Sequence, residues 1–151
     1  MIKTENIVSD ALSQAVETMA FMDIFPPDEE IPAPVAAILA EINFFGPAKG
    51  TFQLLAGKEF AAAVAENYAA EDDVTMQAAI DAMKELVNIT CGLIIPMISH
   101  SKADIYDLSV PLLKTGPDCP SWSEFTALSE CRIINTEGML TAARLKLENT
   151  I

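Results

Sequence analysis

Four residues between positions 81 and 92 have the types and the spacing that a functional site needs. Asp81, Glu85, Asn88 and Gly92 stand at i, i+4, i+7 and i+11, and at about 100° per residue those offsets fall within one narrow stripe of a helix surface. Two carboxylates and an amide offer ionic and hydrogen-bonding contacts to a polar partner. The glycine, which has no side chain, would let the surface of that partner come close.

The same four residues could instead be the solvated face of an otherwise buried helix. Three costs count against that alternative. Asp81 and Glu85 are like charges at i, i+4, which weakens a helix by about 0.2–0.5 kcal/mol. The Asn88 amide competes for backbone groups, and Gly92 costs about 1 kcal/mol relative to alanine. Because three unfavourable choices lie in one line, we interpret the stripe as a site.

The composition limits the classes of partner. The chain has 151 residues, of which 51% are hydrophobic, so it can bury a core and we expect one domain over residues 1–151. A net charge of −13 would repel a nucleic-acid backbone, and the sequence has no polybasic patch for an anionic membrane. We therefore expect neither nucleic acid nor a membrane as a partner.

The amino-terminal sequence and the cysteines bear on compartment and on metals. The start, MIKTENIVSD, has no apolar segment after its lysine, so we expect a cytoplasmic protein without a secretory signal. Cys91, Cys119 and Cys131 lack C-x-x-C spacing and His100 is the single histidine, so we expect reduced thiols and no zinc site. The sequence has no Gly-rich phosphate loop, nucleophile elbow or metal cluster, which argues against a small-molecule enzyme with a cofactor of its own.

The elements that must position the stripe follow from hydrophobic periodicity and turn residues. Helices are predicted at residues 9–25, with Ser9 as the N-cap, at 58–70 and at 74–99. Asp72 or Asp73 is expected to cap the helix at 74–99, which Gly92 weakens and Pro96 kinks or ends.

The remaining segments are predicted mainly as strands and turns. Residues 35–45 and 50–57 flank GPAKG and predict a hairpin whose glycines supply the turn, although residues 35–45 could equally begin as helix. Residues 104–113 alternate like a strand, 115–122 form a loop, and 130–149 predict a closing hairpin that turns at Glu137 and Gly138. The sum is an α+β fold, an antiparallel sheet with long helices on one face.

A faint internal repeat relates the two long helices. Shifting the sequence by 68 residues lays residues 11–21 over 79–89 and matches Ser13 to Asp81 and Glu17 to Glu85. Each helix opens a unit of about seventy residues. The repeat indicates a duplicated αβ module.

The motif around the stripe resembles the signature of a known family. Asp81, Glu85 and Asn88, followed after an interval of twenty-two residues by Pro111, resemble the pattern of the CheC/CheX/FliY chemotaxis phosphatases, [Asp or Ser]-x-x-x-Glu-x-x-Asn and a later Pro. That resemblance implies a CheC-like fold with an internally duplicated αβ unit. In the first copy Ala20 stands where Asn is needed and Asn43 where Pro would fall. The chain therefore looks CheX-like, with a single active motif.

The resemblance also implies an activity and a partner. Members remove phosphate from the aspartyl-phosphate of CheY-like receiver domains, whose own site supplies Mg²⁺ and a lysine. By resemblance, Asn88 would orient the attacking water and Glu85 would pair with the receiver lysine. Asp81 would add to that contact at the rim, Gly92 would leave room, and Pro111 would shape the following strand. CheX-like relatives also imply a homodimer.

The alternative function is a module that binds without catalysis. Relatives in flagellar motors imply that the fold can serve a receiver-binding or flagellar-switch-type role in which the helix is kept for docking. Decay of a phosphorylated receiver separates the two hypotheses, because a docking module would bind the receiver without speeding the decay.

Overall fold

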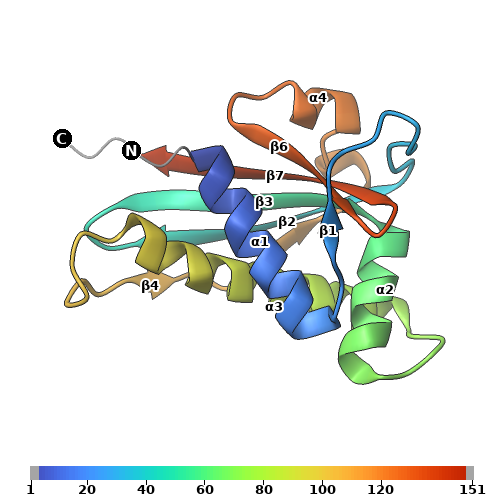
Figure 1. Ribbon diagram of the computed structural model, residues 1–151, viewed down its shortest axis with the longest axis horizontal. Helices are drawn as coiled ribbons and strands as arrows, with labels where there is room; N and C mark the ends of the chain where they lie inside the picture. The colour runs from blue at the N-terminus through green and yellow to red at the C-terminus, as the bar shows by residue number, and fades with distance from the viewer. Residues whose placement is uncertain (1–3, 149–151) are drawn as a thin grey trace.

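The computed structural model describes residues 4–148 of the chain (Figure 1). The helices are α1 (Thr4–Ala20), α2 (Lys58–Ala69), α3 (Met76–Ile98) and the short α4 (Trp122–Thr126), with a 3-10 turn, η1 (Gly116–Asp118). The strands are β1 (Ile24–Phe25), β2 (Ala37–Phe45), β3 (Lys49–Gly57), β4 (Asp107–Leu108), β5 (Leu112–Lys114), β6 (Cys131–Thr136) and β7 (Met139–Glu148). The predicted closing hairpin ended at Asn149, which lies outside the described residues.

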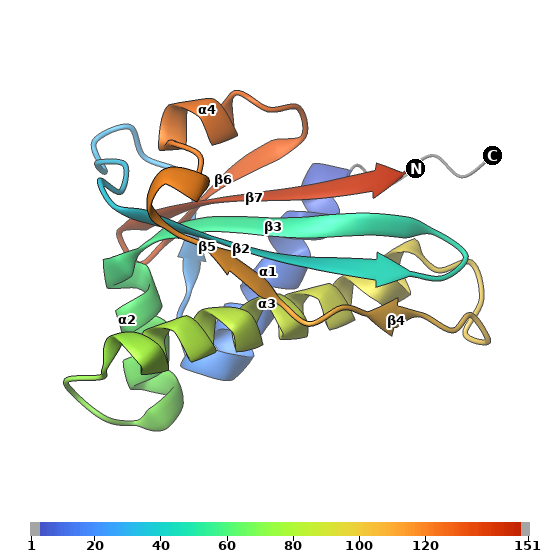
Figure 2. The ribbon, with the colours of Figure 1, turned by 180° about the vertical axis from the view of Figure 1, so that it is seen from behind.

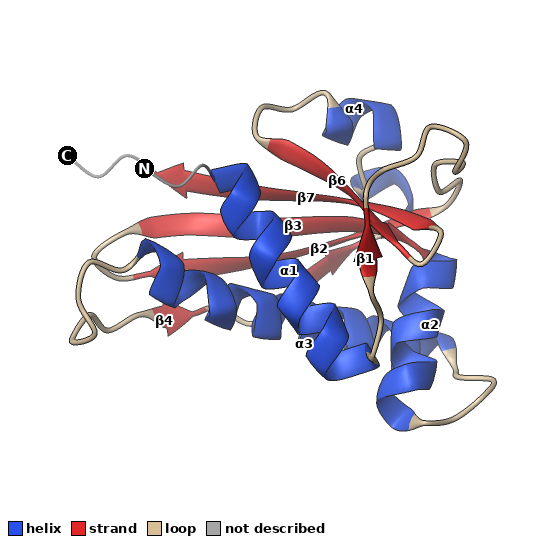
Figure 3. Cartoon of the chain, in the orientation of Figure 1, coloured by secondary structure: helices blue, strands red, loops and turns tan. Residues whose placement is uncertain are grey.

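The strands form one antiparallel sheet. Its order is β1-β6-β7-β3-β2-β4, and β5 also pairs with β2. The helices α1 and α3 lie across one face of the sheet, and α2 packs against both of them (Figures 1 and 3). The α+β class and the placement of the long helices on one face are therefore confirmed.

The side chains of β2 show how the sheet is buried. Ile38, Ala40, Ile42 and Phe44 alternate along the strand and are at most 1% exposed in the core beneath the helices. The opposite face holds a smaller cluster, in which Phe125 of α4 packs with three side chains of the sheet: Leu39, Leu55 and Ala142. Because alternate residues of a strand point to opposite faces, β2 contributes to both clusters.

The topology repeats about the centre of the sheet. There β3 pairs with β7, and each half of the chain contributes a long helix, an edge segment and a hairpin. Edge strand β1 pairs with β6 of the second hairpin, whereas β4 and β5 pair with β2 of the first hairpin. This reciprocal exchange confirms the duplicated αβ unit that the faint sequence repeat indicated.

The predicted bounds of the first helix are wrong at both ends. Helix α1 begins at Thr4, so Ser9 is not its N-cap, and the buried side chains of Ile7 and Val8 extend the apolar face toward the amino terminus. The helix ends at Ala20 because Phe21 adopts a left-handed conformation with φ 55°. The last predicted helical residues form β1 instead.

Two predictions around α3 also need correction. Neither Asp72 nor Asp73 caps the helix: the Thr75 hydroxyl accepts a hydrogen bond from the Ala78 N–H at 3.1 Å, the contact that an N-cap residue makes. Residues 104–113 form two short strands, β4 and β5, rather than one, and Pro111, which has no N–H to donate, lies in the interruption. The long helix is confirmed, but Pro96 does not end it, because α3 continues to Ile98.

Both predicted hairpins form. Residues Glu137 and Gly138 have φ values of 50° and 90°, as a tight two-residue turn between β6 and β7 requires. In the first hairpin Gly46 lies in the turn between β2 and β3, but the predicted reason for Gly50 is wrong, because Gly50 lies within β3. Gly50 is not in a positive-φ conformation; instead a Cβ built on it would lie 2.5 Å from the Phe44 ring and 2.6 Å from the Lys146 carbonyl oxygen. Gly50 is therefore required for close packing.

Gly50→Ala is expected to destabilise the protein by about 1–3 kcal/mol, because the added methyl group must displace a buried ring or a backbone carbonyl. Urea unfolding measures the change. Gly92→Ala is the matched control, since a Cβ at Gly92 meets nothing within 4 Å and alanine favours an exposed helix by about 1 kcal/mol over glycine. Equal stabilities for Gly50→Ala and wild type would show that the hairpin accommodates a side chain at this position.

Candidate active site

Helix α3 presents its polar stripe outward, as the sequence predicted. Eight of its residues are buried on the sheet-facing side, among them Met83, Leu86 and Val87. On the opposite side Asp81, Asn88 and Gly92 are exposed, and Glu85 is half-buried. The helix is thus held by its apolar face, which fixes the position of the polar side chains.

The polar stripe forms one wall of a shallow hollow. Its volume is about 330 Å³ and seven residues line it, four from α3 and three from the segment between β4 and β5. These residues are Asp81, Lys84, Glu85, Asn88, Ser109, Val110 and Pro111. The structure therefore brings together four of the five predicted site residues, and Gly92 lies one turn beyond the hollow.

The second wall runs beside α3 along the edge of β2 (Figure 2). Ser109 fastens this segment to the sheet: its N–H donates to the Asn43 carbonyl oxygen at 2.9 Å, and its hydroxyl accepts from the Asn43 N–H at 2.9 Å. Pro111 immediately precedes β5. The wall opposite Asn88 is therefore held to β2 by one backbone hydrogen bond and one hydrogen bond to the Ser109 hydroxyl.

The polar groups of the α3 wall differ in their partners. The Asp81 carboxylate accepts a hydrogen bond from the Gln77 side-chain amide at 2.9 Å. Within residues 4–148, no hydrogen bond or ion pair engages the Glu85 carboxylate or the Asn88 amide. Those two groups are available to a partner, with Asn88 exposed at the surface and Glu85 held partly within it.

Sequence reasoning missed three residues of the hollow. Lys84 lies on α3 between Asp81 and Glu85. Its place in the sequence next to Glu85 could therefore have indicated that it lies at the site. Ser109 and Val110 enter through the interruption between two short strands. No local pattern marks that interruption except the proline that ends it.

The first copy of the motif does not form a second hollow of this kind. On α1 Ser13 is half-buried and Glu17 is exposed, but Ala20, the counterpart of Asn88, is the last residue of the helix and is 0% exposed. Asn43, the counterpart of Pro111, lies within β2 and holds Ser109 of the other copy. The first copy of the motif therefore forms no site of its own, and its Asn43 helps to position one wall of the hollow.

Ala20→Asn is expected to destabilise the protein by about 1–3 kcal/mol without creating a second active site. The amide would be buried in the core without a hydrogen-bonding partner. Urea unfolding measures the loss of stability, and Thr18→Asn, an exposed position on the same helix turn, is the control. An Ala20→Asn protein as stable as wild type would contradict this expectation.

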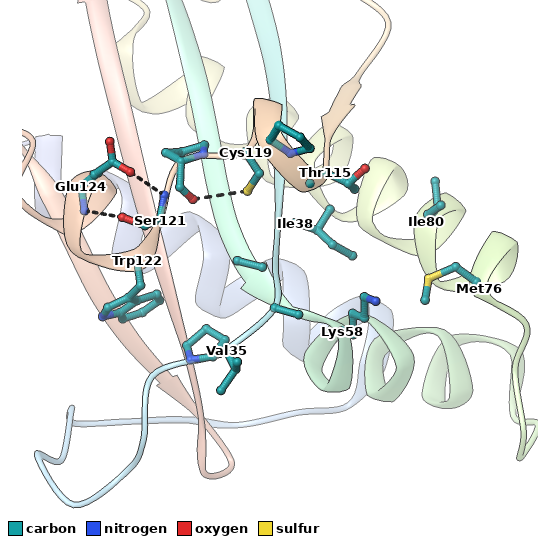
Figure 4. A pocket seen from close by; sticks show the side chains of 16 residues that line it. Val35, Ile38, Lys58, Met76, Ile80, Thr115, Cys119, Ser121, Trp122 and Glu124 are labelled. Atoms are coloured by element: carbon teal, nitrogen blue, oxygen red, sulfur yellow. Dashed lines mark hydrogen bonds between the residues drawn. The ribbon is translucent and has the colours of Figure 1, made fainter.

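A larger pocket lies beyond the other end of β5, where Thr115, Gly116 and Pro117 line it (Figure 4). Its volume is about 700 Å³, and its lining includes Val35, Met76, Ile80 and Trp122. The Glu124 carboxylate in this pocket already accepts from the Ser121 N–H at 3.2 Å. This mainly apolar lining offers no free pair of carboxylate and amide, so the chemistry points to the smaller hollow on α3.

The described residues contain neither a cysteine suited to be a nucleophile nor a cluster of metal-binding side chains. Burial raises the pKa of the Cys91 thiol to about 12, and it also raises the pKa of the Cys119 and Cys131 thiols. All three are free and poorly suited to be nucleophiles, since the thiolate is the reactive form. Residues 4–148 hold no group of three His, Cys, Asp or Glu side chains placed to bind a metal.

The comparisons with known proteins decide the family. The family model described as chemotaxis phosphatase CheX matches residues 38–123, more than half of the chain and the whole of the hollow. The chain belongs to the CheX family of chemotaxis phosphatases. It is accordingly a phosphatase and a hydrolase. No sequence among the curated proteins matches it.

Solved structures show that this CheX-family chain has a CheC-like fold. A putative chemotaxis protein from Desulfovibrio vulgaris Hildenborough has a TM-score of 0.72 and 17% identity, with 97% of each chain covered. The match to the CheX-CheY-BeF3-Mg²⁺ complex from Borrelia burgdorferi has a TM-score of 0.65 and 15% identity, with 99% of this chain and 100% of that chain covered. Thermotoga maritima FliY has a TM-score of 0.61 and 13% identity, with 93% of this chain and 84% of the FliY chain covered. In this chain, no described helix is both long and apolar enough to span a membrane.

Proposed function

We propose that this CheX-family chain hydrolyses the aspartyl-phosphate of a CheY-like receiver domain at the hollow on α3. The observation that carries the proposal is that Asp81, Glu85, Asn88 and Pro111, the four residues of the motif, line one hollow. Both walls of the hollow lie within the segment that matches the family model. A shallow, open site suits a substrate that is itself a folded protein.

Asn88 is proposed to place the attacking water. The water oxygen attacks phosphorus in line, the bond from phosphorus to the aspartate oxygen breaks, and inorganic phosphate and a free aspartate carboxylate result. Catalysis of this step depends mainly on position and on charge stabilisation. An exposed amide with no partner in the described chain can donate and accept at once, and it adds no negative charge beside the phosphoryl group.

Glu85 is proposed to fix the register of the two proteins by pairing with the receiver lysine. The carboxylate is half-buried and faces the hollow without an ion pair in residues 4–148. Asp81, which Gln77 orients, would extend this contact at the rim. Gly92 leaves open space above α3, and Pro111 shapes the wall that enters β5.

The proposed partner is a phosphorylated receiver that brings its own Mg²⁺. The CheX of Borrelia burgdorferi has been solved together with CheY, BeF3 and Mg²⁺, and we extend that pairing to this chain. We further propose that the chain acts in the cytoplasm as a homodimer. Sedimentation of the purified protein tests the dimer.

Phosphate release from a panel of purified, phosphorylated receivers tests the function. The proposal predicts that catalytic amounts of this protein accelerate the decay of at least one receiver and leave the end point unchanged. Binding measured in parallel with the same receivers separates an enzyme from a docking module. If a phosphorylated receiver binds tightly and its decay is unchanged, the chain is a docking module and the proposed activity is wrong.

A further inference from the structure

The hollow contains a cation for which the mechanism above has no role. Lys84 lines the hollow with Asp81, Glu85 and Asn88, and its side chain is half-buried. Residues four apart are neighbours on a helix face, so Lys84 lies one turn before Asn88. It is the one positively charged residue among the seven that line the hollow.

The Lys84 ammonium has no carboxylate partner in the part of the chain that the structure describes. There, the ion pair is between Lys114 and Glu41, at 3.2 Å. Asp81 accepts from Gln77 instead. A lysine stem can lie along a helix while its ammonium, with three donors, reaches solvent. Lys84 is therefore a cation at the site that the fold itself does not use.

The charge of the substrate gives this cation a purpose. A phosphoryl group carries about −1.5 to −2 charge near neutral pH, which the Mg²⁺ and lysine of the receiver offset only in part on their own side. On this protein's side the group meets a hollow lined by two carboxylates. With Lys84 the formal charge of the lining is −1, and without it the lining would be −2. The chain as a whole, at −13, offers no long-range attraction to offset that repulsion.

We propose that Lys84 is a substrate-binding residue that draws the phosphoryl group of the receiver into the hollow and holds it beside Asn88. The inference rests on the proposed function and adds to it a cation supplied by the phosphatase. Because Lys84 contacts charge that is already present in the bound substrate, its removal weakens binding more than it slows the chemical step.

The test measures receiver dephosphorylation over a range of receiver concentrations for Lys84→Gln, Lys84→Glu and Lys84→Arg. Lys84→Gln is expected to raise KM about fivefold with kcat nearly unchanged, which is the scale of one partly screened charge contact. Lys84→Glu is expected to raise KM roughly 25-fold, because the charge change is twice as large. Lys84→Arg retains the charge and is expected to stay near wild type. The increases in KM should shrink as salt is added.

Lys102→Gln is the matched control, because Lys102 is an exposed lysine outside the hollow. If Lys84→Gln matches Lys102→Gln in KM, or if it lowers kcat with KM unchanged, the inference is wrong. A purely structural role would appear as a lower unfolding midpoint and as a salt-independent loss. Wild type and Asn88→Ala are run in the same assay. An active wild type that is impaired by Asn88→Ala, together with normal Lys84 variants, overturns this inference alone, whereas an inactive wild type overturns the proposed function and this inference with it.

Discussion

Asn88→Ala is expected to slow dephosphorylation of the receiver by about 10²- to 10³-fold while the complex still forms. That factor is the scale for losing one well-placed hydrogen-bonding group at a transition state. Without the amide, the attacking water is no longer held in line with the bond that breaks. Glu85 remains in the hollow and keeps the register between the two proteins.

The loss should not be accompanied by unfolding. Asn88 is an exposed residue within α3 whose side chain has no partner in residues 4–148, and alanine is the better helix former by up to about 0.7 kcal/mol. The variant should therefore unfold at the same or a slightly higher urea concentration than wild type. A fall in activity with unchanged or increased stability would locate the effect in the chemistry.

The decisive measurement is single-turnover phosphate release at saturating phosphatase. Asn67→Ala is the control, because Asn67 is an exposed asparagine on α2 that does not line the hollow. It is expected to retain the wild-type rate. Equal rates for Asn88→Ala and wild type would remove Asn88 from the mechanism and leave the domain as a docking module.

The polar stripe could be predicted because it depends on local periodicity. A single helix carries Asp81, Glu85, Asn88 and Gly92, so their angular positions follow from the residue spacing alone. The same holds for the two hairpins, whose strands are adjacent in the sequence. In each case the sequence pattern and the structure are linked by contacts of short range along the chain.

The second wall of the hollow could not be predicted in this way. Ser109 is positioned by Asn43, which precedes it by 66 residues, and the pairing of β4 and β5 with β2 is set by the exchange between the two halves. Contacts of that range leave no periodic signal. Only Pro111 could be assigned to the site beforehand, through the spacing of the family motif.

The predicted starts of α1 and α3 were wrong for a related reason. Ser9 and Asp73 are residue types that often cap helices, yet Ser9 lies within α1 and Thr75 caps α3. Ile7 and Val8 are buried in the core, and this packing keeps the residues before Ser9 helical. Tertiary packing of this kind outweighs a local capping preference. The glycine at position 50 likewise serves packing against Phe44 and not the turn.

Glu85→Ala is expected to weaken the complex with the phosphorylated receiver by about 10- to 100-fold, the range for losing one partner of a charged hydrogen-bonded contact. Turnover should fall as well, since the register that aligns the water is lost. Within α3 the same change removes one of two like charges at i, i+4, which stabilises the helix by about 0.2–0.5 kcal/mol. Weaker binding should therefore accompany equal or greater stability.

Titration against a receiver held in its active form by an acyl-phosphate mimic measures this loss. Glu17→Ala is the matched control, because Glu17 is the exposed counterpart of Glu85 on α1 and its copy of the motif lacks the asparagine. It is expected to bind as wild type does. Substituting the receiver lysine as well should cost little more than either change alone, since both remove the same contact. If the two losses add fully, Glu85 and the lysine do not meet, and Glu85 must act on some other group of the receiver.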